Sequence, residues 1–356
     1  MGSKHLAVEV EKAEIGEDEE EEPVSPTGQY FNSSALSVCI LAVFESDVPI
    51  DDSQMFPLLD TLFLPINPRF SSIMVKDERG VQQWRRVKVN LADHVKVPVF
   101  PAGLSPLAYD ELIDDYMSKV GTDRLPESRP LWELHMFKYP TSHGEGTVMF
   151  KLHHALGDGY SLLSALFSCV KRADDPSLPL TFPGNSTAAK TGGGGGGPGL
   201  VSLVMNSVRD FVWGLAKSTF LEDGVNPIRS GMEGIEFKPV EMSFATFSLD
   251  DIRRVKARIG GVAAQYIHST LKNTSLSISN LIGPKEKMSL ADHPVRSFHF
   301  MVVGVPQSLV ITMVSYMGKL KVAMGTEKGF IDAKLLTTCT EKAFERIYEA
   351  ALEEKP

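Results

Sequence analysis

Apolar and polar residues follow two different periods along this chain. A continuous apolar, β-rich run at 35–44 predicts a central strand that is buried on both faces. The runs at 131–137 and 147–153 alternate between apolar and polar positions, and we expect these two strands to pair. Further strands are predicted at 69–75, 84–89, 242–249, 275–282, 295–303, 308–316 and 319–324, the first two of them as a hairpin.

Helical spacing of apolar residues marks the other regular segments. Residues 51–63 follow a candidate Asp/Ser cap, with Pro57 as an alternative first turn. Two more helices are predicted at 109–120 and from Ser161 to near Lys171–Arg172. The chain closes with an amphipathic helix at 332–352, whose apolar stripe is Leu336, Cys339, Ala343, Ile347 and Ala350. Strands and helices mix in both halves, which predicts the α/β or α+β class with sizeable mixed sheets.

Composition divides the chain into four parts. Residues 1–28 contain an acidic block and almost no apolar periodicity, so we expect a disordered tail. An N-terminal domain is predicted at 29–185. A linker at 186–199, which includes six successive glycines, separates it from a C-terminal domain at 200–356.

The segment Leu200–Leu221 has two interpretations. Its apolar residues fall on one helical face, whereas Arg209, Asp210 and Lys217 interrupt the segment. Charges at the centre of a span are costly in hydrocarbon, so a simple transmembrane helix is not expected. The segment is either an amphipathic helix on a membrane surface or a crossover helix that packs against the core.

Length and charge narrow the class of protein. A chain of 356 residues with 43% hydrophobic residues can form two packed domains. Its net charge of -9 argues against a nucleic-acid partner, although six consecutive carboxylates at 17–22 supply much of that charge. Cys39, Cys169 and Cys339 show no metal-ligand spacing and predict buried thiols in a reducing compartment. The N-terminus has neither a basic start nor an apolar region, so no signal peptide is expected.

The candidate chemistry lies where a predicted strand ends in His153 and His154 and a Gly-Asp-Gly turn at 157–159 leads into a helix. Adjacent strand residues point to opposite faces, so the pair does not predict a metal site. The sequence also lacks the Gly-x-Ser-x-Gly elbow of a serine hydrolase and the Lys-Ser/Thr of a phosphate-binding loop. Two interpretations remain. One histidine is a general base, since an imidazole with a pKa of about 6.5 accepts a proton at cellular pH, or the pair is purely structural.

The heptapeptide His153–Gly159 matches the His-His-x-x-x-Asp-Gly signature of the CoA-dependent acyltransferase superfamily. More specifically, the chain resembles the plant wax ester synthase/diacylglycerol acyltransferase family. The supporting matches are Pro23–Phe31, Pro65–Ser72, Pro130–Glu133, Asn280–Pro284, and the run from His293 through Gly304–Gln307 to Tyr316–Lys319. They cover nearly everything after the acidic tail.

This resemblance implies a chloramphenicol-acetyltransferase-like fold of two mixed-sheet halves with a tunnel between them. It implies that His154 takes the proton from a long-chain alcohol or diacylglycerol hydroxyl, which then attacks the acyl-CoA thioester without an acyl-enzyme. His153 is expected to support the geometry. Asp158 is expected to hold the turn through an ion pair with an arginine that the sequence does not identify. Acyl-CoA is a co-substrate, and neither a cofactor nor a metal is implied.

The resemblance also assigns supporting residues. Gly157 and Gly159 are expected to permit the turn and a close approach of substrate. Asn280, Gly283 and Pro284 are expected to line or support the tunnel. Apolar acceptors imply work at a membrane surface, at the cytosolic face of the endoplasmic reticulum or at the plasma membrane.

One departure from the family concerns the second half. Relatives of this type have a long stretch with an Asn-Asp motif where this chain has only the short bridge Arg258–Ala264, so we expect an incomplete second half. Two alternatives to the lipid acyltransferase therefore stay open. One is an acyltransferase for small soluble acceptors, and the other is a catalytically impaired, truncated isoform that acts as a lipid-binding or regulatory protein.

Overall fold

The computed structural model describes residues 22–25, 28, 32, 37–78, 82–182, 227–228, 230, 232, 235, 238–248, 251, 275–305 and 307–352. Most of the predicted tail, the glycine linker, the 200–221 helix and the bridge Arg258–Ala264 lie outside these residues. The expectations for those segments therefore stay predictions.

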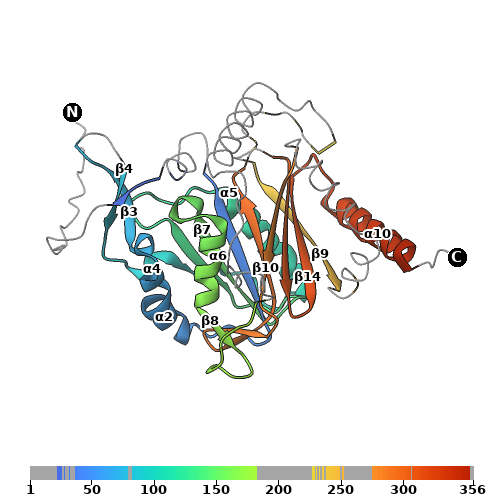
Figure 1. Cartoon of the computed structure of the whole chain (residues 1–356), viewed down its shortest axis with the longest axis horizontal. Coiled ribbons are helices and arrows are strands. Elements are labelled where there is room, and N and C mark those ends of the chain that lie inside the picture. The colour runs from blue at the N-terminus through green and yellow to red at the C-terminus, as the bar shows by residue number, and fades with distance from the viewer. Residues whose placement is uncertain are drawn as a thin grey trace, which may run out of the picture.

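A seven-stranded mixed sheet forms the centre of the fold (Figure 1). In spatial order its strands are β5 (Val95–Lys96), β6 (Trp132–Phe137), β7 (Gly146–His153), β2 (Cys39–Ser46), β12 (His293–Val303), β11 (Met288–Leu290) and β8 (Val170–Arg172). β5 and β6 are parallel, and the other pairs are antiparallel. Every residue of β2 is buried between its neighbours β7 and β12, which confirms the predicted central strand. The predicted pairing of β6 with β7 is also confirmed.

Two smaller sheets complete the strands. The four-stranded sheet contains, in spatial order, β10 (Ser277–Ile282), β13 (Leu309–Tyr316), β14 (Lys319–Glu327) and β9 (Val240–Ser248). The three-stranded sheet contains β1 (Glu22–Pro23), β4 (Gln82–Arg86) and β3 (Ser72–Lys76), of which β3 and β4 form the predicted hairpin. β11 and β12 follow the proposed linker in the chain but belong to the central sheet. The two predicted domains thus share a sheet, and their exact boundaries stay a prediction.

Of the helices that the structure describes in the first half, all but α5 and α6 are short. The helical segment 52–66 consists of η1 (Asp52–Gln54), α2 (Met55–Leu58), the π-helical η2 (Leu59–Phe63) and α3 (Leu64–Ile66). The remaining helices among the described residues are η3 (Pro68–Ser71), α4 (Leu91–His94), α5 (Pro106–Thr122), η4 (His154–Leu156), α6 (Gly159–Ser168) and α10 (Ala333–Leu352). Asp51 caps η1 by accepting a hydrogen bond from the Ser53 N–H. The helical segment therefore starts before Pro57, and the alternative start at Pro57 is wrong.

The two faces of the central sheet have different covers. On one face lie α6 and the segment 52–66, where the Phe167 ring is 5.3 Å from that of Phe298 and the Phe63 ring is 5.6 Å from that of Phe150. On the other face lie α5 and the four-stranded sheet, whose outer side carries α10 (Figure 1). The motif loop between β7 and α6 therefore lies at one end of a strand that is buried by both layers.

Three predictions about helices and thiols need correction. The motif helix begins at Gly159 and ends at Ser168, and Lys171–Arg172 belong to β8 because that segment pairs with β11. The predicted stripe on α10 is wrong: Cys339, Ala343, Ile347 and Ala350 are exposed, and Leu336 is half-buried. The helix instead turns Phe344 toward β9, with its ring 4.6 Å from that of Phe247, because the larger aromatic surface gains more from burial. Cys339 is consequently an exposed thiol, whereas Cys39 and Cys169 are buried as predicted.

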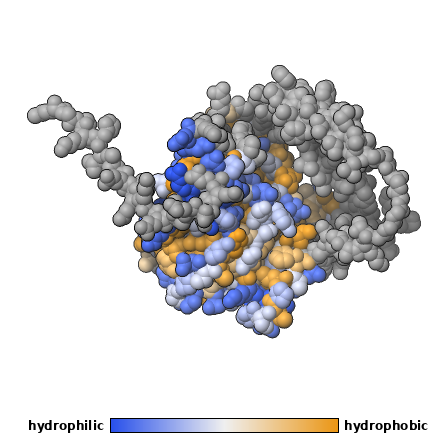
Figure 2. Space-filling model, turned by 60° about the vertical axis from the view of Figure 1, so that its left-hand side comes forward, coloured by the Kyte–Doolittle hydropathy of each residue, from blue (hydrophilic) through white to orange (hydrophobic). Residues whose placement is uncertain are grey.

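The surface over the segment 52–66 is unusually apolar. Met55, Leu58, Leu59 and Phe63 face the core, yet Phe56, Leu62 and Ile66 on the outer side are each 38% exposed. Figure 2 brings this side of the molecule forward and shows apolar residues gathered between polar ones. None of the helices that the structure describes is long and apolar enough to cross a membrane.

Candidate active site

His153 is the last residue of β7, and its ring is fixed on both sides. The Ala155 backbone N–H donates a hydrogen bond to Nδ1 over 3.1 Å. Nε2 lies 3.3 Å from the Ser37 hydroxyl oxygen. Burial, helped by the nearby His154 and Lys151, lowers the pKa of His153 to about 3. The ring is therefore neutral at pH 7, and because Nδ1 is an acceptor, the proton is on Nε2 and points to Ser37.

This tautomer excludes His153 from proton abstraction. Its only acceptor nitrogen already receives the Ala155 N–H, and its side chain is buried. The expected role of His153 in supporting the geometry of the motif stays a prediction.

His154 opens η4 and is half-buried. Its backbone N–H donates to the Val38 carbonyl over 2.8 Å, which ties the motif to the start of β2. Burial lowers the pKa of His154 below 6.5, against smaller raising effects from its own backbone and from Asp158. The imidazole is therefore neutral at pH 7, which is the state that a general base requires.

Asp158 serves as the N-cap of α6. Its Oδ1 accepts a hydrogen bond from the Ser161 backbone N–H over 2.7 Å. This bond is the main cause that holds the pKa of Asp158 below 3.8. Within the described part of the chain the exposed carboxylate forms no ion pair with an arginine, so the implied arginine partner is still unassigned. The structure gives Asp158 another way to hold the turn, because it fixes where α6 begins.

The motif glycines are not required by backbone conformation. Gly157 is extended, with φ 173°, which any residue can adopt. A Cβ at Gly157 would meet Leu162 at 3.4 Å, and one at Gly159 would meet Ile40 at 3.8 Å, both ordinary contacts. Close approach of a substrate remains the prediction that explains these two positions.

Two residues of the segment Pro65–Ser72 hold the motif turn from outside. The Leu156 carbonyl accepts hydrogen bonds from Asn67 Nδ2 over 3.5 Å and from Arg69 Nη1 over 3.2 Å. Arg69 is itself ion-paired with Glu22. The sequence marked this segment only as a family match. Its contact with the motif is long-range and has no local signal.

Gly304 supports the site from the end of β12. Its backbone has φ 76°, a conformation that favours glycine, and a Cβ there would lie 1.9 Å from the Ser37 carbonyl oxygen. The Ser37 hydroxyl contacts His153. Gly304 therefore packs against the residue whose side chain contacts this histidine.

Asn280, Gly283 and Pro284 lie on or just after β10, which pairs in parallel with β13. Asn280 is exposed, whereas Gly283 and Pro284 are buried. A Cβ at Gly283 would lie 2.2 Å from the Ser315 carbonyl oxygen, so glycine is needed there for the approach of two backbones. Their role in a tunnel stays a prediction.

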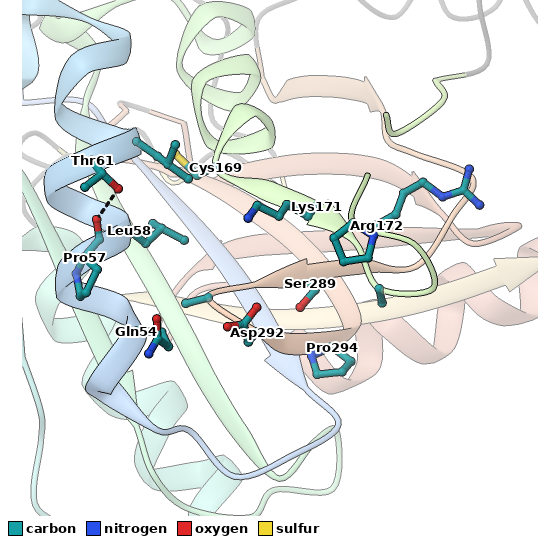
Figure 3. Close-up of a pocket in the computed structure, with 14 residues that line it drawn as sticks. Gln54, Pro57, Leu58, Thr61, Cys169, Lys171, Arg172, Ser289, Asp292 and Pro294 are labelled. Carbon is teal, nitrogen blue, oxygen red and sulfur yellow. Dashed lines mark hydrogen bonds between the residues drawn. The ribbon is translucent and has the colours of Figure 1, made fainter. Parts of the chain in front are cut away.

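The cavity shown in Figure 3 lies away from the histidines. It has a volume of about 330 Å³ and lies between the segment 52–66, β8 and the β11–β12 turn. Cys169, at the C-terminal end of α6, lines it, whereas the motif lies at the N-terminal end of that helix. The Lys171 amine points from β8 toward the helical segment (Figure 3). We assign no catalytic role to this cavity.

The donor set around the motif does not suggest a metal site. In the part of the chain that the structure describes, no three His, Cys, Asp or Glu side chains come together in a way that could hold an ion.

Models of two protein domains match the chain. The wax ester synthase/diacylglycerol acyltransferase catalytic domain matches residues 38–264, and the WS/DGAT C-terminal domain matches residues 242–348. The catalytic-domain match alone covers more than half of the chain and includes the histidine pair.

Curated relatives come from Arabidopsis thaliana. Wax ester synthase/diacylglycerol acyltransferase 4 is 31% identical over 257 residues, which is 67% of this chain and 49% of the relative. Wax ester synthase/diacylglycerol acyltransferase 7 is 32% identical over 255 residues, again 67% of this chain and 51% of the relative. The chain thus spans about half the length of the curated relatives it matches.

Solved structures share the fold. The wax ester synthase/diacylglycerol acyltransferase from Marinobacter aquaeolei VT8 superposes with a TM-score of 0.59 at 13% identity, covering 92% of this chain and 99% of that one. A starter condensation domain of rhizomide synthetase RzmA, solved as a mutant with C8-CoA and Leu-SNAC, gives a TM-score of 0.54 at 10% identity over 94% of this chain and 95% of that one. The predicted CoA-dependent acyltransferase fold is confirmed. The domain matches and the relatives together show that the chain belongs to the wax ester synthase/diacylglycerol acyltransferase family.

Proposed function

We propose that this chain is an acyl-CoA-dependent O-acyltransferase that makes wax esters from long-chain alcohols or triacylglycerol from diacylglycerol. The observation that carries the proposal is the unequal state of the two motif histidines. His153 is buried and has its acceptor nitrogen occupied by the Ala155 N–H, whereas His154 is half-buried and neutral at pH 7. We therefore assign His153 to holding the geometry of the motif and His154 to accepting the proton.

In the proposed reaction the acceptor hydroxyl loses its proton to the His154 imidazole as its oxygen attacks the thioester carbonyl. The new C–O ester bond forms, the C–S bond breaks, and the CoA thiolate leaves with the proton from the imidazolium. No acyl-enzyme is needed, because the chain holds both substrates for direct attack. We assign no donor to the oxyanion.

The apolar acceptors of the proposed reaction partition into membranes. We therefore propose that the protein works at a membrane surface, at the endoplasmic reticulum or the plasma membrane. The amphipathic segment 200–221 remains the predicted contact, and it lies outside the described residues.

A second candidate function rests on chain length. Because the chain spans about half of each curated relative, a lipid-binding or regulatory protein without turnover is the alternative. It would keep the fold and the affinity for acyl-CoA but form no ester.

Incubation of the purified chain with radiolabelled palmitoyl-CoA separates the two. Hexadecanol and dioleoylglycerol are offered as acceptors in parallel, with glycerol as the soluble control. Ester formed with either lipid acceptor supports the enzyme, and the ratio between them gives the acceptor class. A folded sample that binds palmitoyl-CoA and forms no ester would support the regulatory alternative.

A further inference from the structure

A second polar cavity lies between the two large sheets, well away from the paired histidines. Its volume is about 380 Å³, and its lining comes from β2, β9, β12, the β13–β14 hairpin and the loop before β7. Glu45 on β2 belongs to this lining, and Cys39, which pairs with His153, lies six residues earlier on the same strand. At about 3.4 Å per residue, the cavity is roughly 20 Å from the motif. It is therefore a separate site.

The fixed charges in the lining are mainly positive. Arg296, Lys319 and Lys321 carry three cations, whereas Glu45 is the one carboxylate among the described residues of the lining. Lys321 Nζ lies 3.1 Å from each carboxylate oxygen of Glu45 and donates to the Ser297 hydroxyl over 3.0 Å. This buried pair neutralises itself and joins β2 to β14. Of the other two cations, Lys319 forms no ion pair with a described residue, and Arg296 shares the Asp47 carboxylate with Lys287, which leaves one positive charge over.

Arg296 and Lys319 both have hydrogen-bond donors to offer a ligand. Arg296 uses Nε for the Asp47 carboxylate, at 2.6 Å, and Lys287 shares the same carboxylate. The terminal guanidinium nitrogens of Arg296 donate to no side chain in the described ranges. Lys319 follows the two-residue turn Met317–Gly318, in which both residues have positive φ, and its amine forms no ion pair with any described residue. Lys319 is exposed and belongs to the lining of the cavity.

The rest of the lining suits an organic group. The ring of Phe244 supplies an apolar wall, and the hydroxyls of Ser142, Thr246 and Ser297 supply neutral hydrogen-bonding groups. A volume of this size lies at the lower end of the range for small-molecule sites, about 300–1,000 Å³.

We propose that this cavity binds a phosphomonoester. Arg296 and Lys319 would contact the phosphate, because a guanidinium and an ammonium from two strands can share one dianion through charge-assisted hydrogen bonds. The organic part would pack against the ring of Phe244. A phosphomonoester can come from a lipid headgroup, from a soluble metabolite, or from a nucleotide such as the 3′-phosphate of CoA, and the experiment distinguishes these sources.

The test is isothermal titration of the full chain at low ionic strength with three probes. These are glycerol 3-phosphate, adenosine 3′,5′-bisphosphate and dioctanoyl phosphatidic acid below its critical micelle concentration. We expect saturable binding of at least one probe, and the probe that binds best identifies the source. Binding should weaken as salt is added, because the contacts are ionic.

Two lysine variants make the test specific. Lys319→Gln should weaken the binding by about tenfold or more, since it removes one charge-assisted contact. Lys334→Gln makes the same change at an exposed position on α10 outside the cavity and should leave the affinity unchanged. Equal affinities of the two variants would overturn the proposal, as would the lack of saturable binding of all three probes up to about 10 mM. His154→Ala should not alter the binding of these probes. Failure of the proposed phosphomonoester site is therefore distinguishable from failure of the proposed acyl transfer.

Discussion

The Ala155 backbone N–H donates to Nδ1 of His153 over 3.1 Å, which fixes the proton of that ring on Nε2. The bond is local, only two residues apart, and it exists because β7 ends in η4 rather than continuing as a strand. In the proposed mechanism this bond leaves proton transfer to His154.

The first prediction tests this bond. Asn at position 153 can place its carbonyl oxygen near the position of Nδ1, whereas Gln cannot. His153→Asn should therefore stay within about 1 kcal/mol of the wild-type stability, and His153→Gln should lose about 1–3 kcal/mol because the buried Ala155 N–H loses its acceptor. Urea unfolding at pH 7 measures both. Equal losses in the two variants would show that the bond does not matter.

The second prediction concerns pH. Burial lowers the pKa of His154 below 6.5, so the base is neutral above that pH and becomes protonated only as the pH falls through the lowered value. kcat/KM for ester formation should thus reach a plateau on the alkaline side and should fall on the acid side, with a midpoint below pH 6.5. The pKa of His153, about 3, lies too low to contribute to this limb. An acid limb centred above pH 6.5 would contradict the assignment.

The third prediction separates the helix cap that Asp158 provides from the effect of its charge on the pKa of His154. Asp158→Asn keeps an oxygen that can cap α6 but removes the charge that raises the pKa of His154. It should cost only a few tenths of a kcal/mol in stability and shift the acid limb to lower pH. Asp158→Ala should cost about 1 kcal/mol through loss of the cap. Thermal unfolding and the pH profile of kcat/KM, measured on both variants, check the two effects.

The fourth prediction compares two glycines with positive φ. At Gly318, with φ 75°, a Cβ would meet nothing within 4 Å, so Gly318→Ala should cost only the backbone strain, about 1–2 kcal/mol. At Gly304 the same strain adds to the clash with the Ser37 carbonyl. Gly304→Ala should therefore be less stable than Gly318→Ala and should also lower turnover, since Ser37 contacts His153. Equal turnover in the two variants would remove Gly304 from the support of the site.

Sequence patterns predicted the strands well because most of them are long, buried runs with clear flanking turns. The correct predictions include the strand at 35–44, the β6–β7 pair and the strands β12, β13 and β14. The end of α6 was missed because Val170–Arg172 gains its strand pairing from β11, more than one hundred residues away in the chain. The face of α10 was missed by one position, since spacing alone does not weigh Phe344 against smaller residues.

The motif was visible in the sequence, but its supports were not. Nothing local marks Ser37 as the partner of His153 or Arg69 as the donor to the Leu156 carbonyl, because these contacts span 116 and 87 residues. The tautomer of His153 likewise follows from a backbone geometry that no residue pattern records.

The most direct test of the central claim is the turnover of His154→Ala with labelled acyl-CoA and the preferred lipid acceptor. Circular dichroism and the thermal midpoint should first show that the variant folds as the wild type does. Loss of a general base should lower kcat by about 10²- to 10⁴-fold, while binding of acyl-CoA stays unchanged. Wild-type turnover in a folded His154→Ala protein would contradict the account, because the proton would then have another acceptor.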